Sequence, residues 1–346
     1  MNDDVFYNGV KLLSLKDING KKPEIFICTS NRNAGKTTYF NRLCVNKFLR
    51  DGEKFCLVYR WSYEMDDCSD KFFKDIGGLF FPEYTMSNQE RSNGIYHELF
   101  LNDKPCGYAV ALNKADQIKK VSHLLSDTMR MLFDEFQSET STYCTKELVK
   151  LQSIHTSIAR GQHQQVRYVP LYMLSNPVSI INPYYCAMGI SARLRNNTKF
   201  LKGDGWVLEQ GFNEAASTAN KESGFNRAFA GNEYQAYSSE GVYLNDNMAF
   251  IEKPQSKNYY ICTLKCDGVY YGIREYPEEG IVYCDTKPDM TFPRKIAVTT
   301  DDHQINYVML KRNSNFIKIL KDYFMHGAFR FKDLQSKDAV MKALSF

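Results

Sequence analysis

The chain has 346 residues, of which 43% are hydrophobic and 24% charged, a composition typical of globular proteins with material for two ordinary domains. Its mean hydropathy is −0.45, and no apolar run approaches the roughly 20 residues that a membrane-spanning helix needs. Residues 1–7 are acidic on balance and lack the basic start of a secretory signal. We therefore expect neither a membrane-spanning nor a secreted protein.

The positive charge is unevenly distributed. The formal net charge is +4, from 44 Lys and Arg against 40 Asp and Glu. Residues 311–346 hold eight basic and three acidic side chains, which sum to +5, so the rest of the chain is close to neutral. Such a C-terminal cluster is either a solvated helix face or a surface that binds a polyanion.

Ten cysteines are scattered along the chain without a Cys-x-x-Cys pair. The closest two, Cys262 and Cys266, have no His or Cys partners at zinc-ligand spacing. We expect reduced, mostly buried thiols like those of cytosolic proteins, and no metal site built from them.

Short apolar runs alternate with helical patterns over the first two hundred residues, which predicts an α/β domain with a largely parallel sheet. The predicted elements are a strand over Glu24–Thr29, a helix over Lys36–Arg50, a strand over Lys54–Arg60, a hairpin over Gly94–Leu112 and strands over Met129–Phe133 and Leu171–Leu174. Gly52 follows the helix, as is common where a helix ends in a left-handed residue.

The pattern changes after residue 195. Residues 196–246 are rich in Asn, Ser, Gly, Ala and Glu with weak periodicity, which predicts a linker or small lid-like subdomain. A β-rich pattern follows, and then amphipathic helices. These elements are strands over Tyr259–Leu264, Gly268–Arg274 and Gly280–Asp285, and helices over Asp301–Arg312, Ser314–Met325 and Ser336–Leu344. The predicted domains are thus 1–195, 196–246 and 247–346.

A loop of the phosphate-binding type joins the first predicted strand to the first helix. Its residues are Ser30, Asn31, Arg32, Asn33, Ala34, Gly35, Lys36 and Thr37, with Thr38 next in the helix. Backbone N–H groups of such a loop wrap phosphates, Lys36 reaches the β and γ oxygens of ATP, and the Thr37 hydroxyl binds Mg²⁺. Ser30 stands where the motif has glycine. An ordinary strand–helix turn is the alternative, but the flanking strand and helix favour the phosphate loop.

Two adjacent carboxylates end the apolar strand Met129–Phe133. Asp134 is placed to hold the Mg²⁺ shell, and Glu135 to polarise the attacking water. Alone, such a pair usually marks only a strand end; downstream of a phosphate loop, with another strand between, it is specific. The glutamate favours a hydrolase over a kinase, because water must be oriented.

Further polar residues lie near this site. Asn176 follows the strand Leu171–Leu174, where its amide could sense the γ-phosphate or simply form a turn. Arg160, within Ile158–Gly161, could be an arginine finger, worth roughly 10³–10⁵ in rate. Arg32, inside the phosphate loop, is a second candidate. For both arginines, the alternative is an ordinary surface residue.

With these motifs the chain resembles, over nearly its whole length, the genome-packaging ATPases of phi-29-like bacteriophages, which are relatives of the large terminase subunits. Besides the phosphate loop, the resemblance is carried by Val5–Asn8, Phe133–Phe136, Leu174–Asn176, Val178–Ser179, Asn182–Tyr184, Phe250–Lys253 and Thr299–Asp302. The Ser-Asn…Asn-Pro-Tyr and Thr-Thr-Asp-Asp stretches are not general ATPase motifs, so the match is specific.

The resemblance implies an ASCE-type P-loop NTPase domain that works with ATP and Mg²⁺ in a homomeric ring, a pentamer in this family. The ring would sit on the portal (connector) protein of an empty procapsid through a prohead RNA and drive double-stranded DNA inward. The implied location is the host cytoplasm and, transiently, the portal vertex, with no membrane contact and no place in the mature virion. Arg160 matches the family's trans-acting arginine finger, and Lys119 or Lys120 a second trans-acting residue.

The resemblance also implies a C-terminal domain with a ribonuclease-H-like fold, related to the terminase nuclease but lacking its metal site. The predicted strand Tyr259–Leu264 agrees, because it has no acidic residue where such nucleases need one. We therefore expect no nuclease activity. Of the basic residues that the family uses to grip DNA after the second strand, only Arg60 remains, and Lys71 and Lys74 are alternatives.

Three functions are compatible with these motifs. A packaging motor should contact phosphates of any sequence, which predicts salt-sensitive DNA binding without a consensus site, with the basic C-terminal helices facing DNA or RNA. A helicase or replication ATPase could use the same core. A scaffold that binds nucleotide or RNA structurally is disfavoured, because it would not need Lys36, Asp134 and Glu135 together.

Overall fold

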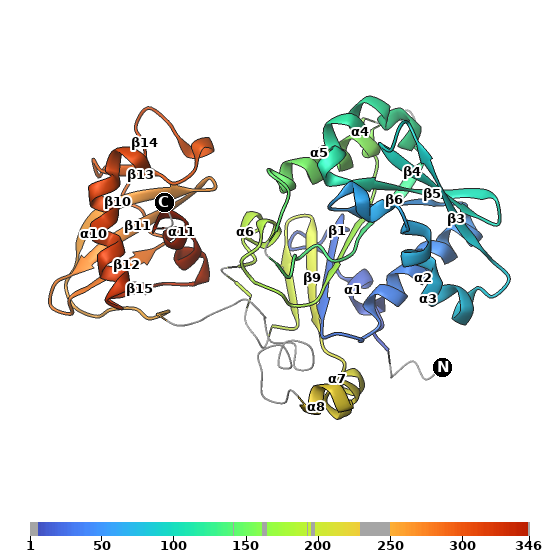
Figure 1. Cartoon of the computed structure of the whole chain (residues 1–346), viewed down its shortest axis with the longest axis horizontal. Helices are drawn as coiled ribbons and strands as arrows, with labels where there is room; N and C mark the ends of the chain where they lie inside the picture. Colours follow the sequence, from blue (N-terminus) through green and yellow to red (C-terminus); the bar gives the residue numbers. More distant parts are fainter. Residues whose placement is uncertain are drawn as a thin grey trace. The chain divides into compact units, whose positions relative to one another are not determined.

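The computed structural model describes residues 6–140, 142–160, 165–191, 193–194, 198–228 and 250–344. Val5, Gly161, residues 195–197 and 229–249 and the last two residues of the sequence lie outside this description. The chain divides into two compact units, which comprise residues 1–184 with 194–245 and residues 185–193 with 246–346. Figure 1 shows both units in sequence colours.

The described part of the first unit is built on a nine-stranded sheet with the order β3-β4-β5-β2-β6-β7-β1-β9-β8. Its strands are β1 (Ile25–Ser30), β2 (Lys54–Tyr59), β3 (Met86–Arg91), β4 (Tyr96–Leu101), β5 (Lys104–Ala111), β6 (Thr128–Phe133), β7 (Leu171–Ser175), β8 (Phe200–Gly203) and β9 (Trp206–Gly211). The central strands from β5 to β9 are parallel, and β3, β4 and β8 are antiparallel at the two edges. This confirms the predicted α/β fold with a largely parallel sheet.

The helices of the first unit follow the strands in the expected alternation. They are α1 (Val10–Ser14), α2 (Lys36–Asp51), α3 (Cys68–Phe80), α4 (Ala115–Val121), α5 (Glu147–Ala159), α6 (Pro183–Ala187, where the chain leaves this unit), α7 (Glu214–Glu222) and α8 (Gly224–Ala228), with 3₁₀ turns η1 (Ser62–Met65), η2 (Leu112–Lys114) and η3 (Ser122–Leu125). Phe40 of α2 and Phe72 of α3 share a core with Leu57 and Leu132 of the sheet. Figure 1 shows α4 and α5 lying together, away from α2 and α3.

The prediction that residues 196–246 form a separate linker is wrong for residues 200–211. These form the β8–β9 hairpin, and β9 pairs in parallel with β1, so that Ile25 lies opposite Trp206. The first domain therefore does not end at residue 195. The apolar run in β9, Trp206–Leu208, is only three residues long. Because the residues around it are mostly polar, the sequence gives little indication that this run is buried.

The second unit has a six-stranded sheet in its described part, with the order β14-β13-β10-β11-β12-β15. Its elements are β10 (Tyr259–Cys266), β11 (Val269–Tyr276), β12 (Ile281–Asp285), β13 (Lys295–Ala297), β14 (Val308–Met309), β15 (Phe329–Phe331), α10 (Ser314–Met325) and α11 (Leu334–Leu344). Antiparallel pairing of β10, β11 and β12 matches the predicted meander. Ile317 of α10 and Val340 of α11 pack with Leu264, Ile273 and Cys284 of this sheet.

The predicted helix over Asp301–Arg312 is wrong. That stretch holds the 3₁₀ turn η5 (Thr300–Asp302), strand β14 and the turn η6 (Leu310–Asn313). The buried Asp302 carboxylate accepts the backbone N–H groups of Asp267 and Gly268, each at 2.8 Å, and the Thr299 hydroxyl at 2.5 Å. These bonds fix a turn where the spacing of apolar residues alone favours a helix.

All ten cysteines are free thiols, and all but Cys186 are buried. Among the described residues, no helix combines the length and the apolar character that crossing a bilayer requires.

Candidate nucleotide site

The predicted phosphate loop lies between β1 and α2, at the carboxyl end of a central parallel strand. Asn33 and Gly35 adopt left-handed conformations, with φ of 63° and 92°. Gly35 is the N-cap of α2, a 16-residue helix whose N-terminus carries unpaired N–H groups and the positive end of the helix dipole. Ser30, Asn31 and Ala34 of the loop are buried. The two left-handed residues turn the chain from β1 into α2, where backbone amides at the helix N-terminus can bind an anion.

Lys36 and Asn176 meet although 140 residues separate them. The Lys36 Nζ donates to Oδ1 of Asn176 at 2.7 Å. The contact forms because β7, which ends just before Asn176, is the parallel neighbour of β1. Lys36 is buried, and desolvation lowers the pKa of its ammonium group although the Asp134 carboxylate opposes this shift. The structure therefore brings together two residues that the sequence analysis selected separately.

Thr37 and Asp134 form the second contact of the site. The Thr37 hydroxyl donates to Oδ2 of Asp134 at 2.8 Å, and Oδ1 accepts the backbone N–H of Glu135 at 2.9 Å. Burial raises the pKa of the Asp134 carboxyl, although Lys36 and the Thr37 hydroxyl favour its ionised form. A hydroxyl and a carboxylate are hard oxygen ligands, so this pair fits Mg²⁺ shared with phosphates.

Glu135 follows β6 in a left-handed conformation with φ of 54°. It lines a cavity of about 320 Å³ together with Thr37, Tyr59, Lys71 and Asp134. Partial burial raises the pKa of the Glu135 carboxyl, and the neighbouring carboxylates of Asp134 and Glu139 add to the shift. The cavity leaves room for water beside a carboxylate whose proton affinity is increased.

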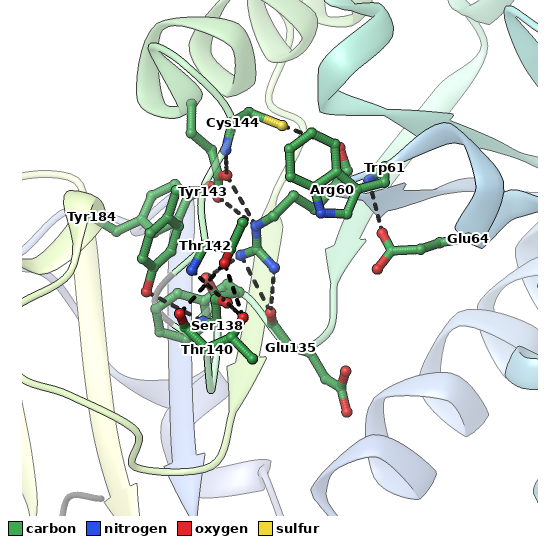
Figure 2. A network of polar contacts seen from close by, with 12 residues as sticks. Arg60, Trp61, Glu64, Glu135, Ser138, Thr140, Thr142, Tyr143, Cys144 and Tyr184 are labelled. Carbon is green, nitrogen blue, oxygen red and sulfur yellow. Dashed lines mark hydrogen bonds and ion pairs between the residues drawn. The ribbon is translucent and has the colours of Figure 1, made fainter. Parts of the chain in front are cut away.

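Arg60, one of the residues that the resemblance left open for gripping DNA, is a buried structural group. Its Nε lies 3.0 Å from Oε2 of Glu147, and its Nη2 donates to the carbonyl of Phe136 at 2.7 Å. The Arg60 and Glu147 side chains are 8% and 1% exposed. Tyr184 donates to Oε1 of Glu147 at 2.6 Å. Figure 2 shows Arg60 among its polar contacts, one of which reaches the backbone carbonyl of Glu135. The charge of Arg60 is therefore already paired inside the domain.

Two asparagines of the phosphate loop bind the segment that follows β9. Asn31 and Asn213 exchange reciprocal bonds, from Asn31 Nδ2 to the Asn213 carbonyl at 3.0 Å and from the Asn213 N–H to Asn31 Oδ1 at 2.9 Å. Asn33 Nδ2 donates to Oδ1 of Asn220 at 2.8 Å. This clasp of the loop by α7 has no local signal in the sequence, because 182 residues separate Asn31 from Asn213.

The candidate arginine and lysine fingers lie apart from this site, with one exception. Arg32 pairs with Glu139, which neighbours Glu135. Arg160 is exposed at the C-terminal end of α5, and Lys119 and Lys120 are exposed on α4. Lys119 lies 3.5 Å from Asp116 of the same helix.

Helix α5 runs antiparallel to β6. Its first residue, Glu147, is joined through Arg60 to the backbone of Phe136, just after β6 ends. Near its other end, the Ile158 carbonyl is joined through Arg167 to the carbonyl of Thr128, where β6 begins. The 13 residues of α5 span roughly 20 Å. Arg160 therefore lies near the amino ends of the parallel strands, whereas Glu135 of the same chain lies at their carboxyl ends.

The nine-stranded, largely parallel sheet, with a phosphate-type loop at the end of β1, puts the first unit in the α/β class. The chain belongs to the podovirus DNA encapsidation protein (Gp16) family, whose model matches residues 1–344. This confirms the resemblance that the motifs indicated.

Individual relatives match over most of their length. The DNA packaging protein of Bacillus phage phi29 is 25% identical over 335 residues, which cover 96% of this chain and 94% of that protein. The DNA packaging protein of Bacillus phage B103 is 24% identical over 304 residues, 87% of this chain and 90% of that protein.

Two solved structures share the fold over nearly the whole chain. One is from the bacteriophage phi-29 viral genome packaging motor assembly, with a TM-score of 0.70 at 23% identity, covering 99% of this chain and 97% of that one. The other is the phi-28 gp11 DNA packaging motor, with a TM-score of 0.60 at 19% identity and 99% of both chains covered.

Proposed function

We propose that this protein is an ATP-hydrolysing ring motor that drives double-stranded viral DNA through the portal into a procapsid. One observation carries the proposal: Lys36, Thr37, Asp134, Glu135 and Asn176 converge at the carboxyl ends of adjacent parallel strands, in a chain of the DNA encapsidation family. A phosphate loop with a metal-binding pair and a water-polarising glutamate is the arrangement of an ATP hydrolase. The strand order supports an ASCE-type P-loop domain, because β7 lies between β1 and β6.

Each residue of the site has a distinct role in this proposal. The loop from Ser30 to Thr38 surrounds the phosphates of ATP, and Lys36 neutralises their charge. Thr37 and Asp134 hold Mg²⁺, which balances the negative charge of the phosphates when bound. Glu135 orients the attacking water and accepts its proton, and Asn176 links the position of Lys36 to the end of β7.

Arg160 completes the reaction in a neighbouring subunit. Because α5 carries Arg160 to the amino ends of the strands, away from Glu135 of its own chain, Arg160 supplies its charge to the next chain in the ring. Lys119 or Lys120, on the adjacent helix α4, is the second trans-acting group. An arginine supplied in this way stabilises the charge of the transition state.

The partners and the second unit complete the proposal. The ring is a pentamer that docks on the portal protein through prohead RNA, works in the host cytoplasm and is absent from the mature virion. The second unit is a ribonuclease-H-like domain without nuclease activity. Its exposed basic residues Lys311, Arg312, Lys318 and Lys321, on η6 and α10, face DNA or the RNA.

The test is protection of DNA from nuclease by procapsids that carry portal and prohead RNA. We expect protection with the wild-type protein and ATP, and none without ATP or with Glu135→Ala. The matched control is Glu139→Ala, which removes a neighbouring carboxylate but leaves the proposed water-orienting group. Absence of protection by the wild-type protein, with strand separation in reactions without procapsids, would instead identify a helicase.

A further inference from the structure

Arg167 is a buried arginine that the proposed reaction does not use. It is 6% exposed and follows α5 in the chain. Its Nη2 donates to the carbonyls of Ser126 at 2.6 Å and Ile158 at 2.8 Å, and its Nη1 to the carbonyl of Thr128 at 3.1 Å. Within the part of the chain that the structure describes, its oxygen partners are all backbone carbonyls. Arg167 thus connects three segments through their main chain.

Each of the three segments leads to a residue of the proposed ring reaction. Ile158 is in the last turn of α5, two residues before Arg160. Thr128 begins β6, the strand that Asp134 and Glu135 follow directly. Ser126 follows η3, the turn directly after α4 with its two lysines. One guanidinium therefore joins the helices of the proposed trans-acting residues to the strand of the carboxylates.

The end of α5 needs such support. The last carbonyls of a helix have no partner within the helix, and helix ends fray unless another group binds them. Arg167 binds two of them, because its backbone N–H also donates to the Ala159 carbonyl at 2.8 Å. Arg160 follows at once in extended conformation, with φ of −79° and ψ of 153°.

We propose that Arg167 is a positioning residue that holds the base of Arg160 in a fixed place relative to β6, so that each subunit presents its arginine finger to its neighbour correctly. This inference rests on the proposed trans action of Arg160. A catalytic group must be held within roughly 0.5 Å of its productive position, and a 1 Å error costs on the order of 10²-fold in rate. Only arginine provides planar donors that reach several carbonyls at once.

The test uses Arg167→Lys and Arg167→Met in the full chain assembled on procapsids. We expect kcat for ATP to fall on the order of 10²-fold, while KM stays within about twofold because the subunit's own phosphate loop is untouched. Mixing either variant with Glu135→Ala subunits should restore part of the activity. In such rings, an intact Arg160 of the Glu135→Ala subunit reaches the intact Glu135 of the Arg167 variant.

A matched control is Arg130→Met. Arg130 is equally buried and lies in β6, but it pairs with Glu53 and Tyr172, away from α5. Activity lost in that variant through general destabilisation should not return on mixing. Wild-type kcat in Arg167→Lys would overturn the inference. It would also be overturned if mixing with Glu135→Ala subunits rescued Arg160→Ala but neither of the two Arg167 variants. Failure to rescue Arg160→Ala itself would overturn the proposed trans action of Arg160 instead.

Discussion

The ammonium group of Lys36 and the amide oxygen of Asn176 lie 2.7 Å apart, although 140 residues separate them in the sequence. Lys36 begins α2, and Asn176 directly follows β7. Both groups are in the first unit, at the carboxyl end of the parallel sheet. The amide gives the buried lysine an acceptor, and because an ammonium has three N–H donors, phosphate can bind Lys36 beside the amide or in its place. In the proposed reaction, Asn176 would therefore be placed to respond to the γ-phosphate.

Replacing Asn176 distinguishes this role from that of a simple turn. Asn176→Ala should lower kcat up to roughly tenfold with a small effect on nucleotide affinity, because a neutral hydrogen bond worth about 0.5–1.5 kcal/mol is lost. Asn176→Asp should weaken ATP binding more than Asn176→Ala, because a carboxylate pairs with Lys36 and repels phosphate. Steady-state hydrolysis and titration with a fluorescent nucleotide measure both effects. Wild-type kinetics in Asn176→Ala would show that Asn176 has no role in hydrolysis and only forms the turn after β7.

The pH dependence of hydrolysis should reflect Glu135. Its carboxyl must be ionised to accept a proton from water, and burial with nearby carboxylates raises its pKa. Activity should therefore be lost, as the pH falls, at a higher pH than for an ordinary glutamate. Glu139→Gln removes one of the repelling carboxylates, so the acid limb of kcat/KM should move to lower pH. If the acid limb of kcat/KM is unchanged in Glu139→Gln, the group that titrates is not Glu135.

The Arg60–Glu147 pair should contribute to stability and not to DNA affinity. Removing one partner of a buried ion pair costs about 3–5 kcal/mol, because the other charge is left unpaired. We expect Arg60→Met to lower the free energy of unfolding by that order and Arg60→Met/Glu147→Leu to recover part of it. The slope of DNA affinity against salt should stay as in the wild type. A smaller slope in the folded Arg60→Met variant would show that Arg60 contacts a DNA phosphate after all.

The clasp between the phosphate loop and α7 should support nucleotide binding. Asn31→Ala removes two hydrogen bonds between the buried Asn31 side chain and the half-buried backbone of Asn213, each worth about 0.5–1.5 kcal/mol. The loop is then less well ordered, so KM for ATP should rise. Asn33→Gly is the matched control, because glycine keeps the left-handed conformation at this position and the bond lost to Asn220 is exposed. Equal KM values in the two variants would contradict this prediction.

The second unit should not cleave nucleic acid with Mn²⁺. Strand β10 has no acidic residue, and the carboxylates nearby have other partners: Asp285 lies 3.2 Å from Nε of Arg274, and Asp267 lies 2.9 Å from Nζ of Lys342. Among the described residues, no cluster of three His, Cys, Asp or Glu side chains could hold a metal ion. Incubating plasmid DNA with the full chain and Mn²⁺ tests this, and cleavage that Asp285→Asn abolishes would refute it.

Local patterns predicted the parts of the molecule whose contacts are local or continuous. Strand β1 is buried on both faces and reads as an uninterrupted apolar run, and the phosphate loop is contiguous. The pairing of Arg60 could not be predicted because a charge in the sequence does not show its partner, and Glu147 lies 87 residues further on. The 301–312 segment was misread because the side chain of Asp302 outweighs a helical spacing of apolar residues.

The antiparallel course of β6 and α5 has a consequence for assembly. In the proposed ring reaction, it gives each subunit an acceptor side with the carboxylates and a donor side with Arg160, and these two sides differ. Subunits that complete one another's reaction must join donor to acceptor, which is a heterologous contact. A two-fold dimer pairs identical patches, so it would bring donor to donor and leave both reactions incomplete. Heterologous contacts instead propagate in one direction and are satisfied everywhere only when the chain of subunits closes into a ring.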